Sequence, residues 1–203
     1  IDFYKNYLMA DEVIVCLTDP ENFRKSVDPT YKMNRKPVVK PVMLNQAKDY
    51  MGSKHDTFRR PGLEGDDVMG ILATHPTLIK GEKIIVSEDK DMRTVPAKLF
   101  NPDNLDVGVM DITEEDAIRF HLWQTIVGDS ADGYPGCRGL GKKSPWAQEM
   151  LEADMEDLWD IVIEAYASKG QTEDQAIIQA QLAHILWASS YDFKAKEVRL
   201  WQP

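Results

Sequence analysis

The stretch GLEGDDVMG, residues 62–70, places three carboxylates within four positions, at Glu64, Asp66 and Asp67. The apolar run VMGIL begins directly after the acids, and the pattern over residues 64–75 predicts a buried helix. Carboxylates this close repel one another, and burying them together is costly. Two explanations stay open: the acids favour a helix N-terminus through the helix dipole, or cations neutralise them.

Two short β-branched runs lie before and after this helix in the sequence. EVIVCLT (12–18) and KIIVS (83–87) predict buried parallel strands. Acids follow both runs, with Asp19 after the first and Asp89 and Asp91 in EDKD after the second. In open α/β sheets, ligands collect at the carboxyl ends of the strands. We therefore expect these acids to face one crevice.

The sequence becomes helical after about residue 112. Two helix starts carry capping-box residues, Thr113 with Asp116 and Thr172 with Gln175. A helix is also predicted over the acidic stretch 149–167, and a terminal strand or tail over KEVRLW (196–201). These changes predict two regions, an α/β core over 1–112 and a helical region over 113–203.

Asp129 and Asp132 in GDSAD form a fourth acidic group. Each group alone has a simple structural explanation, as a helix N-terminus, a solvated loop or a capped turn. Taken together they suit hard divalent cations, since Mg²⁺ uses few carboxylates plus water and substrate phosphate. Two ions about 4 Å apart can activate water and stabilise the leaving oxygen in phosphodiester cleavage. The predicted metal ligands are Asp19, Glu64, Asp66, Asp67, Asp89, Asp91, Asp129 and Asp132.

PGCRGLGKK (135–143) follows directly after the last acidic pair. Glycines let backbone N–H groups approach phosphate oxygens closely, and Arg138, Lys142 and Lys143 add positive charge. This is the sequence form of a helix-hairpin-helix turn, which holds a DNA backbone without reading bases. An ordinary glycine-rich turn is the simpler alternative.

The net charge of −10 argues, taken alone, against a nucleic-acid binder. The bases are unevenly spread, however: residues 24–40 hold six Lys or Arg and one acid, whereas 149–160 holds six acids and no base. The basic stretch is either a solvated loop or a clamp over a substrate phosphate. Binding depends on the local field, so the total charge does not decide the question.

Other features of the sequence narrow the class of protein. The two cysteines, Cys16 and Cys137, lack metal-ligand spacing and fit a reduced cytosolic protein. No apolar run approaches about 18 residues, so no transmembrane helix and no membrane partner are expected. There is no signal-peptide pattern, Walker A motif, dinucleotide fingerprint or GxSxG motif. The absence of an initiator Met suggests that the natural N-terminus lies upstream of Ile1.

Three motifs resemble those of the 5′-nuclease (flap endonuclease) superfamily, and most closely the 5′→3′ exonucleases of short-tailed phages. GLEGDDVMG, VSEDKD and GDSADGYPGCRGLGKK occur in the family's order and approximate spacing, and the likeness runs from about residue 12 to the end. It implies an α/β fold with a parallel-sheet, PIN-like core, a helical arch over 24–52, and a helix-hairpin-helix motif in the helical region.

The resemblance also implies an activity. This is removal of nucleotides from the 5′ ends or flaps of double-stranded DNA, and of RNA primers paired to DNA, by two Mg²⁺ or Mn²⁺ ions. The expected setting is phage DNA replication or degradation of host DNA by a monomer in the cytoplasm of the host cell. Family members often also hold K⁺ at the glycine-rich turn.

Carried over by motif, the catalytic residues would be Lys32, Arg35 and Asp67, with the eight acids above at the metal centre. DNA contacts would come from Arg24, Lys25, Tyr31, Lys32, Arg35, Lys36, Gly136, Arg138, Gly139, Gly141, Lys142 and Lys143.

The chain departs from the family pattern in three places. The family begins with an apolar strand ending in a metal-binding Asp, and no segment before Asp19 matches it, so that strand is expected upstream or on another chain. Gly133 stands where the family has Asn, and Pro145 follows the turn in KKSPW. Two competing functions remain: a non-catalytic DNA-end-binding protein and an acid-loop phosphatase, the latter leaving the glycine-rich turn unexplained.

Overall fold

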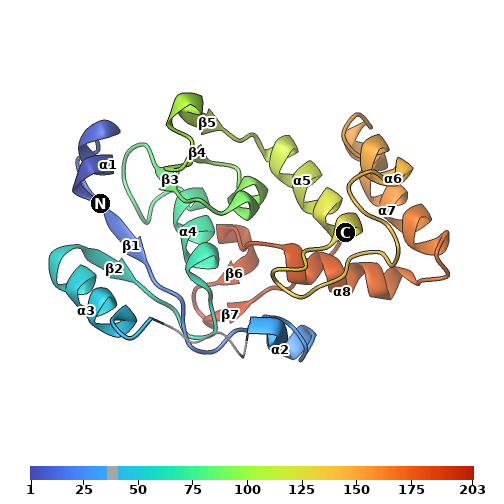
Figure 1. The fold of residues 1–203 in the computed structure, drawn as a ribbon, viewed down its shortest axis with the longest axis horizontal. Coiled ribbons are helices and arrows are strands. Elements are labelled where there is room, and N and C mark those ends of the chain that lie inside the picture. Colours follow the sequence, from blue (N-terminus) through green and yellow to red (C-terminus); the bar gives the residue numbers. More distant parts are fainter. Residues whose placement is uncertain (36–40) are drawn as a thin grey trace.

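The computed structural model describes residues 1–35 and 41–203 (Figure 1). Short strands and helices make up the first half of the chain, in the order α1 (Asp2–Tyr7), β1 (Ile14–Cys16), α2 (Arg24–Val27), η1 (Met33–Arg35), α3 (Leu44–Lys54), β2 (Asp56–Phe58), α4 (Gly65–Thr74), β3 (Ile84–Val86), η2 (Lys90–Thr94), β4 (Lys98–Phe100), η3 (Leu105–Val107) and β5 (Val109–Asp111).

Both predicted strands are present as β1 and β3, each in a parallel pair, but the predicted burial is wrong for most of their residues, since only Ile85 is buried. They do not pair with each other, however. β1 pairs with β2, whereas β3 pairs with β4, which also pairs antiparallel with β5. Helix α4 contacts both β1 and β3 and links the two small sheets. The mixed α/β architecture predicted from the sequence is therefore confirmed, with the sheet in two pieces among the described residues.

Helix α4 begins where the sequence predicts. Glu64 is its N-cap, and a capping box joins Glu64 and Asp67 through reciprocal side chain to backbone hydrogen bonds. Val68, Ile71 and Leu72 are buried in a core shared with Leu186 and Tyr191 near the C-terminus. The C-terminal end of the predicted helical region (113–203) thus packs against helix α4 of the predicted α/β core (1–112).

Gly70 lies where α4 meets this C-terminal segment. A Cβ atom on Gly70 would lie 2.4 Å from the carbonyl oxygen of Leu186. We expect Gly70→Ala to lower the free energy of unfolding by about 1–3 kcal/mol, because backbone must move to admit the methyl group. Gly52 in α3 is a matched control: its Cβ would meet only the Thr57 side chain, at 3.8 Å. Gly52→Ala should be stabilising by about 0.5–1 kcal/mol in urea unfolding, and equal effects at the two sites would contradict this account.

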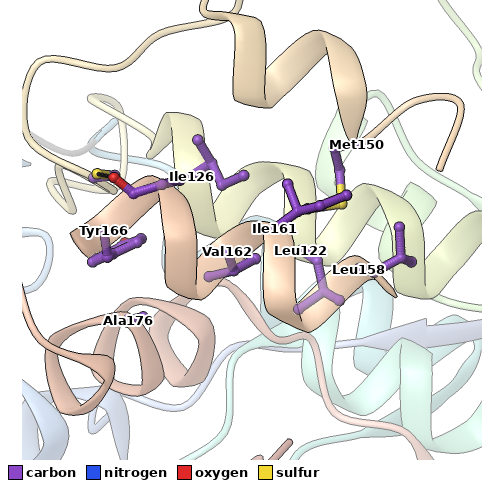
Figure 2. Packing of buried hydrophobic residues seen from close by; sticks show 10 residues of the cluster. Leu122, Ile126, Met150, Leu158, Ile161, Val162, Tyr166 and Ala176 are labelled. Atoms are coloured by element: carbon purple, nitrogen blue, oxygen red, sulfur yellow. Dashed lines mark hydrogen bonds between the residues drawn. The ribbon is translucent and has the colours of Figure 1, made fainter. Parts of the chain in front are cut away.

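Helices dominate the second half of the chain, on the opposite side of the molecule from β1–β5 (Figure 1). The elements are α5 (Glu114–Val127), α6 (Pro145–Glu149), η4 (Met155–Asp157), α7 (Leu158–Ala167), α8 (Glu173–Ala183), η5 (Ala188–Ser190) and the strands β6 (Tyr191–Asp192) and β7 (Glu197–Val198). Both predicted capping boxes are confirmed, at α5 and α8. Figure 2 shows the apolar core among α5, α6, α7 and α8, which includes Leu122 and Ile126 of α5 and Val162 and Tyr166 of α7. Within the described ranges, none of the helices is both long and apolar enough to cross a membrane.

The single helix predicted over 149–167 is wrong. The chain leaves helical geometry after α6, and Asp154 is extended, with ψ 152°. The Arg119 guanidinium from α5 accounts for the break, since it donates to the carbonyl oxygens of Met150 and Ala153 at 2.7 and 2.8 Å. These carbonyls therefore find partners without a continuous helix.

Two buried histidines, His121 of α5 and His184 after α8, contact each other with ring centroids 5.0 Å apart and ring planes tilted by 55°. Burial lowers the pKa of His121 to about 4 and also lowers that of His184. An unfolded histidine titrates near 6.5, so below that pH the unfolded chain takes up protons that the folded chain excludes. Folding stability should consequently fall as the pH drops from about 6.5 towards 4, with His121 alone contributing roughly 3 kcal/mol.

The measurement compares urea unfolding of the wild type and His121→Gln at about pH 7 and pH 5. Carboxylates contribute equally to the pH dependence of both proteins, so the difference isolates the histidine. The variant should lose less stability on acidification. An unchanged pH dependence would contradict the assignment.

Candidate functional site

Carboxylates from distant segments meet at the start of α4, and basic side chains bridge them. Lys32 Nζ lies 2.5 Å from Glu64 Oε1 and 3.2 Å from Asp132 Oδ2. The Tyr31 hydroxyl lies 3.1 Å from Glu64 and 3.0 Å from the same Asp132 oxygen, and Arg35 pairs with the other Asp132 oxygen. Residues 31–35 of the predicted arch therefore join the acid motif GLEGDD to the acid motif GDSAD.

Asp91 and Asp129 form a second pair of acids, and Lys90 bridges them. Its Nζ atom lies 2.6 Å from Asp91 Oδ1 and also contacts Asp129. The buried Gln124 of α5 donates to Asp91 at 2.7 Å. Neither Lys90 nor Gln124 was among the predicted site residues. The position of Lys90 between two acids of SEDKD is the only sequence signal that could have indicated it, and Gln124 carries none.

Asp66 lies among the acids and is mostly buried. Burial, followed by repulsion from Asp89, Glu64 and Asp67, raises the pKa of Asp66 to about 7. Asp66 also lies near the end of β1, where it helps to raise the pKa of Cys16. Asp89 accepts a hydrogen bond from the Asp91 backbone N–H at 2.9 Å, which begins η2. A cation in this region would relieve the repulsion that acts on Asp66.

Asp67 is held in a buried ion pair. It is fully buried, and the Arg24 guanidinium donates to both of its carboxylate oxygens, at 2.8 and 2.7 Å. The backbone N–H groups of Glu64 and Leu186 donate to it as well. With its oxygens occupied in this way, Asp67 is a structural ion-pair partner in this structure, and its role in cation binding and catalysis stays a prediction.

Asp19 is set apart from these pairs. Arg59 Nε donates to it at 2.9 Å, and it lines a cavity of about 500 Å³ with Asn45 and Lys48 of α3. Burial opposes ionisation, but backbone hydrogen bonds from Glu21 and Gly62 and the Arg59 contact outweigh it and lower the pKa of Asp19. Lysines bridge Glu64 with Asp132 and Asp91 with Asp129, whereas Asp19 pairs with Arg59, and the convergence of all these acids at one crevice stays a prediction.

Two of the residues predicted to contact DNA are buried. Arg24 is 2% exposed and Tyr31 is 3% exposed, and both bind acids of the site. In this structure these two side chains face acids of the protein, and their contact with DNA stays a prediction. Lys25 and Arg35 are exposed, Lys32 is partly exposed, and Lys36 lies outside the described residues.

The glycine-rich turn between α5 and α6 has an inner and an outer part. Gly136 is buried with φ 63°, a Cβ on it would lie 2.4 Å from the Gly128 nitrogen, and its N–H donates to Gln179. Close backbone packing explains the glycine at this position, and its contact with DNA stays a prediction. The outer positions are exposed at Arg138, Gly139, Gly141, Lys142 and Lys143.

The two other departures from the family pattern fit the local backbone. Gly133 has φ 79°, a left-handed conformation that glycine and asparagine both tolerate. Pro145 occupies the first turn of α6 after the N-cap Ser144, where proline costs no hydrogen bond.

The donor atoms suit a hard cation. Within residues 1–35 and 41–203, no three acidic, His or Cys side chains converge closely enough to hold an ion. The acids instead form oxygen pairs neutralised by lysine and arginine. Mg²⁺ characteristically takes one or two carboxylates with water and substrate phosphate, so paired carboxylates fit such an ion. Glu64 with Asp132, Asp91 with Asp129, and Asp66 near Asp89 are the residues available to hold it.

The family model for the 5′-3′ exonuclease N-terminal resolvase-like domain matches residues 2–118. The chain is also 36% identical to the exonuclease of Escherichia phage T7 over an alignment of 226 positions, covering 94% of this chain and 74% of that protein. The chain belongs to the 5′-3′ exonuclease family. The flap endonuclease Xni of Shewanella sp. (strain W3-18-1) is 31% identical, over 66% of this chain and 54% of Xni.

Solved structures place this exonuclease-family chain in the 5′-nuclease fold. A flap endonuclease of bacteriophage T5, crystallised as a complex with DNA and metal ions, superposes with a TM-score of 0.68 at 18% identity. The match covers 90% of this chain and 77% of the T5 chain. T5 5′-exonuclease with bound zinc superposes with a TM-score of 0.63 and the same coverage of this chain. The PIN-like fold inferred from the sequence is therefore confirmed.

Proposed function

We propose that this chain is a divalent-metal-dependent 5′→3′ exonuclease that removes nucleotides from the 5′ ends or flaps of duplex DNA. One observation carries the proposal: carboxylates from the start of α4, the β3–η2 segment and the turn after α5 meet in two pairs, one bridged by Lys32 of the arch and the other by Lys90 of η2. Membership of the exonuclease family supports it. RNA primers paired to DNA are included as substrates, and Mg²⁺ is the proposed ion, with Mn²⁺ as a substitute.

The acid pairs Glu64–Asp132 and Asp91–Asp129, with Asp66 and Asp89, would hold the ions. When bound, divalent ions supply a nucleophilic water and stabilise charge on the phosphate. Lys32 and Arg35 bind the phosphate near the scissile bond. Both now contact Asp132, so incoming phosphate would exchange one anionic partner for another.

Residues 113–203 would supply most of the grip on duplex DNA, and residues 1–112, including the arch over 24–52, the chemistry. The exposed Arg138, Lys142 and Lys143 contact phosphates, and Gly139 and Gly141 let the backbone approach them. K⁺ binding at the same turn is part of this proposal. The protein would act as a monomer in the host cytoplasm, in phage DNA replication or in degradation of host DNA.

The test uses a duplex labelled at the 5′ end of one strand. Release of short labelled products in Mg²⁺, and no release in the presence of a chelator, would support the proposal. Degradation that starts from the 3′ end would reject it. One observation favours an alternative, a non-catalytic DNA-end binder: the described acids form pairs and no triad. Duplex binding without any cleavage in Mg²⁺ or Mn²⁺ would support that alternative.

DNA affinity should fall steeply with salt, because phosphate contacts release counterions. Replacing Lys142 and Lys143 together by alanine should reduce the slope of log affinity against log salt by about two. The exposed pair Lys80 and Lys194, replaced together by alanine, controls for total charge. Equal slopes for the two double variants in fluorescence anisotropy would contradict DNA contact at the turn.

A further inference from the structure

Lys90 makes two contacts that the proposed reaction does not explain. It is the first residue of η2, and its side chain is 53% exposed. Its ammonium nevertheless reaches inward to Asp91 and Asp129, whose side chains are only 14% and 10% exposed. A lysine anchored on the surface thus neutralises two largely buried carboxylates from separate segments.

The acids need this positive charge when they are ionised together. Burial raises the pKa of Asp91, even though Lys90 donates to its carboxylate. Burial opposes ionisation of Asp129 too, but the hydrogen bond and charge of Lys90, together with backbone hydrogen bonds from Ala131 and Asp132, outweigh burial and hold the pKa of Asp129 below its usual range. The Lys90 ammonium is therefore the local counter-ion of the pair.

A divalent ion on the same pair would need the oxygens that Lys90 now contacts. Mg²⁺ binds carboxylate oxygen at about 2.0–2.1 Å, closer than the 2.6 Å between Lys90 Nζ and Asp91 Oδ1. An ion and an ammonium cannot both lie between the two carboxylates at such distances, and their charges repel. The long, half-exposed lysine side chain can turn outward into solvent, whereas Asp91 is held by Gln124.

We propose that Lys90 is a built-in competitor of the divalent cation at the Asp91–Asp129 pair, and that it sets the affinity of this position. The ammonium neutralises the acids in the ion-free protein and leaves when the ion binds. This inference rests on the proposed function, because it assumes that these acids bind a divalent ion.

Calorimetric titration of the full chain with Mn²⁺ or Mg²⁺, without DNA, tests the competition directly. Lys90→Met should bind the ion about three- to tenfold more tightly, since the competing ion pair is gone. Lys90→Arg, which keeps the charge, should bind much as the wild type does. Lys98→Met is the matched control, because Lys98 forms an exposed ion pair with Glu82 elsewhere on the surface.

A double-mutant cycle separates competition at this pair from a general effect of charge. In an Asp129→Asn background, Lys90→Met should no longer tighten ion binding. A gain that persists in that background, or an unchanged affinity in Lys90→Met alone, would overturn the proposal for Lys90. After either of these two results, the proposed function still stands if the wild type cleaves DNA with Mg²⁺. If the wild type binds no divalent ion at all, both proposals fail.

Thermal unfolding gives a readout that is independent of activity. A ligand stabilises the folded state in proportion to the logarithm of its concentration over Kd. The rise in Tm on adding Mn²⁺ should therefore be larger for Lys90→Met than for the wild type and unchanged for Lys98→Met. Circular dichroism of each ion-free variant verifies that it is folded.

Discussion

Replacing Asp91 and Asp129 together by asparagine will lower the rate of Mg²⁺-dependent DNA cleavage by about 10³-fold or more. The two side chains are largely buried and share one cationic partner, so their loss removes a complete pair of anionic oxygens from the site. Loss of one preorganised charge-stabilising group alone commonly costs about 10²- to 10³-fold in catalysis. The measurement is single-turnover cleavage of a 5′-labelled duplex at saturating Mg²⁺.

The control removes two negative charges from a part of the surface outside the candidate site. Asp103 and Asp106 are exposed in the segment between β4 and β5. Asparagine at both should leave the cleavage rate within about twofold, because surface substitutions away from such sites have small effects. Near wild-type cleavage by the Asp91→Asn, Asp129→Asn protein, folded by circular dichroism, would show that the reaction occurs elsewhere.

Arg24→Met should be a strongly destabilising substitution. The Arg24 guanidinium is almost fully buried, pairs with both oxygens of Asp67, and donates to the carbonyl oxygens of Leu182 and His184. Removing one partner of a buried ion pair leaves an uncompensated charge and costs about 3–5 kcal/mol. The free energy of unfolding in urea should fall by about that amount.

Two comparisons make the measurement specific to the pair. Arg24→Met combined with Asp67→Leu should recover part of the lost stability, since no buried charge then remains unpaired. Arg199→Met removes an exposed ion pair with Asp192 and should cost no more than about 1 kcal/mol. A double variant less stable than Arg24→Met alone would contradict the account.

The parts of the fold that the sequence predicts well have local causes. The N-terminus of α4 and the two capping boxes depend on side chains within four residues of the backbone they cap. The strands β1 and β3 follow from short β-branched runs. The break between α6 and α7 could not be predicted, because its carbonyl groups accept hydrogen bonds from Arg119, about 30 residues away in the sequence.

In the candidate site, too, some features follow from local sequence and others depend on tertiary contacts. The acid motifs indicated which carboxylates come together, with Asp91 and Asp129 as the clearest case. The sequence did not reveal which acids have basic partners. Nothing in GLEGDD distinguishes Asp67, which Arg24 occupies fully, from Asp66, which has repulsive acidic neighbours. That difference arises from the tertiary position of Arg24 and from the return of the C-terminal segment to α4.

The packing of α4 between the two small sheets affects the positions of acids in the candidate site. β1 and β3 each contact this helix, so their spacing depends on how α4 is seated against the C-terminal segment at Gly70. Asp66 is carried by the helix, and Asp89 follows β3. A shift of the helix of even a few tenths of an ångström would alter the separation of these two carboxylates. If Asp66 and Asp89 hold the proposed ion, interior packing sets their separation, and a methyl group added deep inside the protein would change the preference between a smaller and a larger ion.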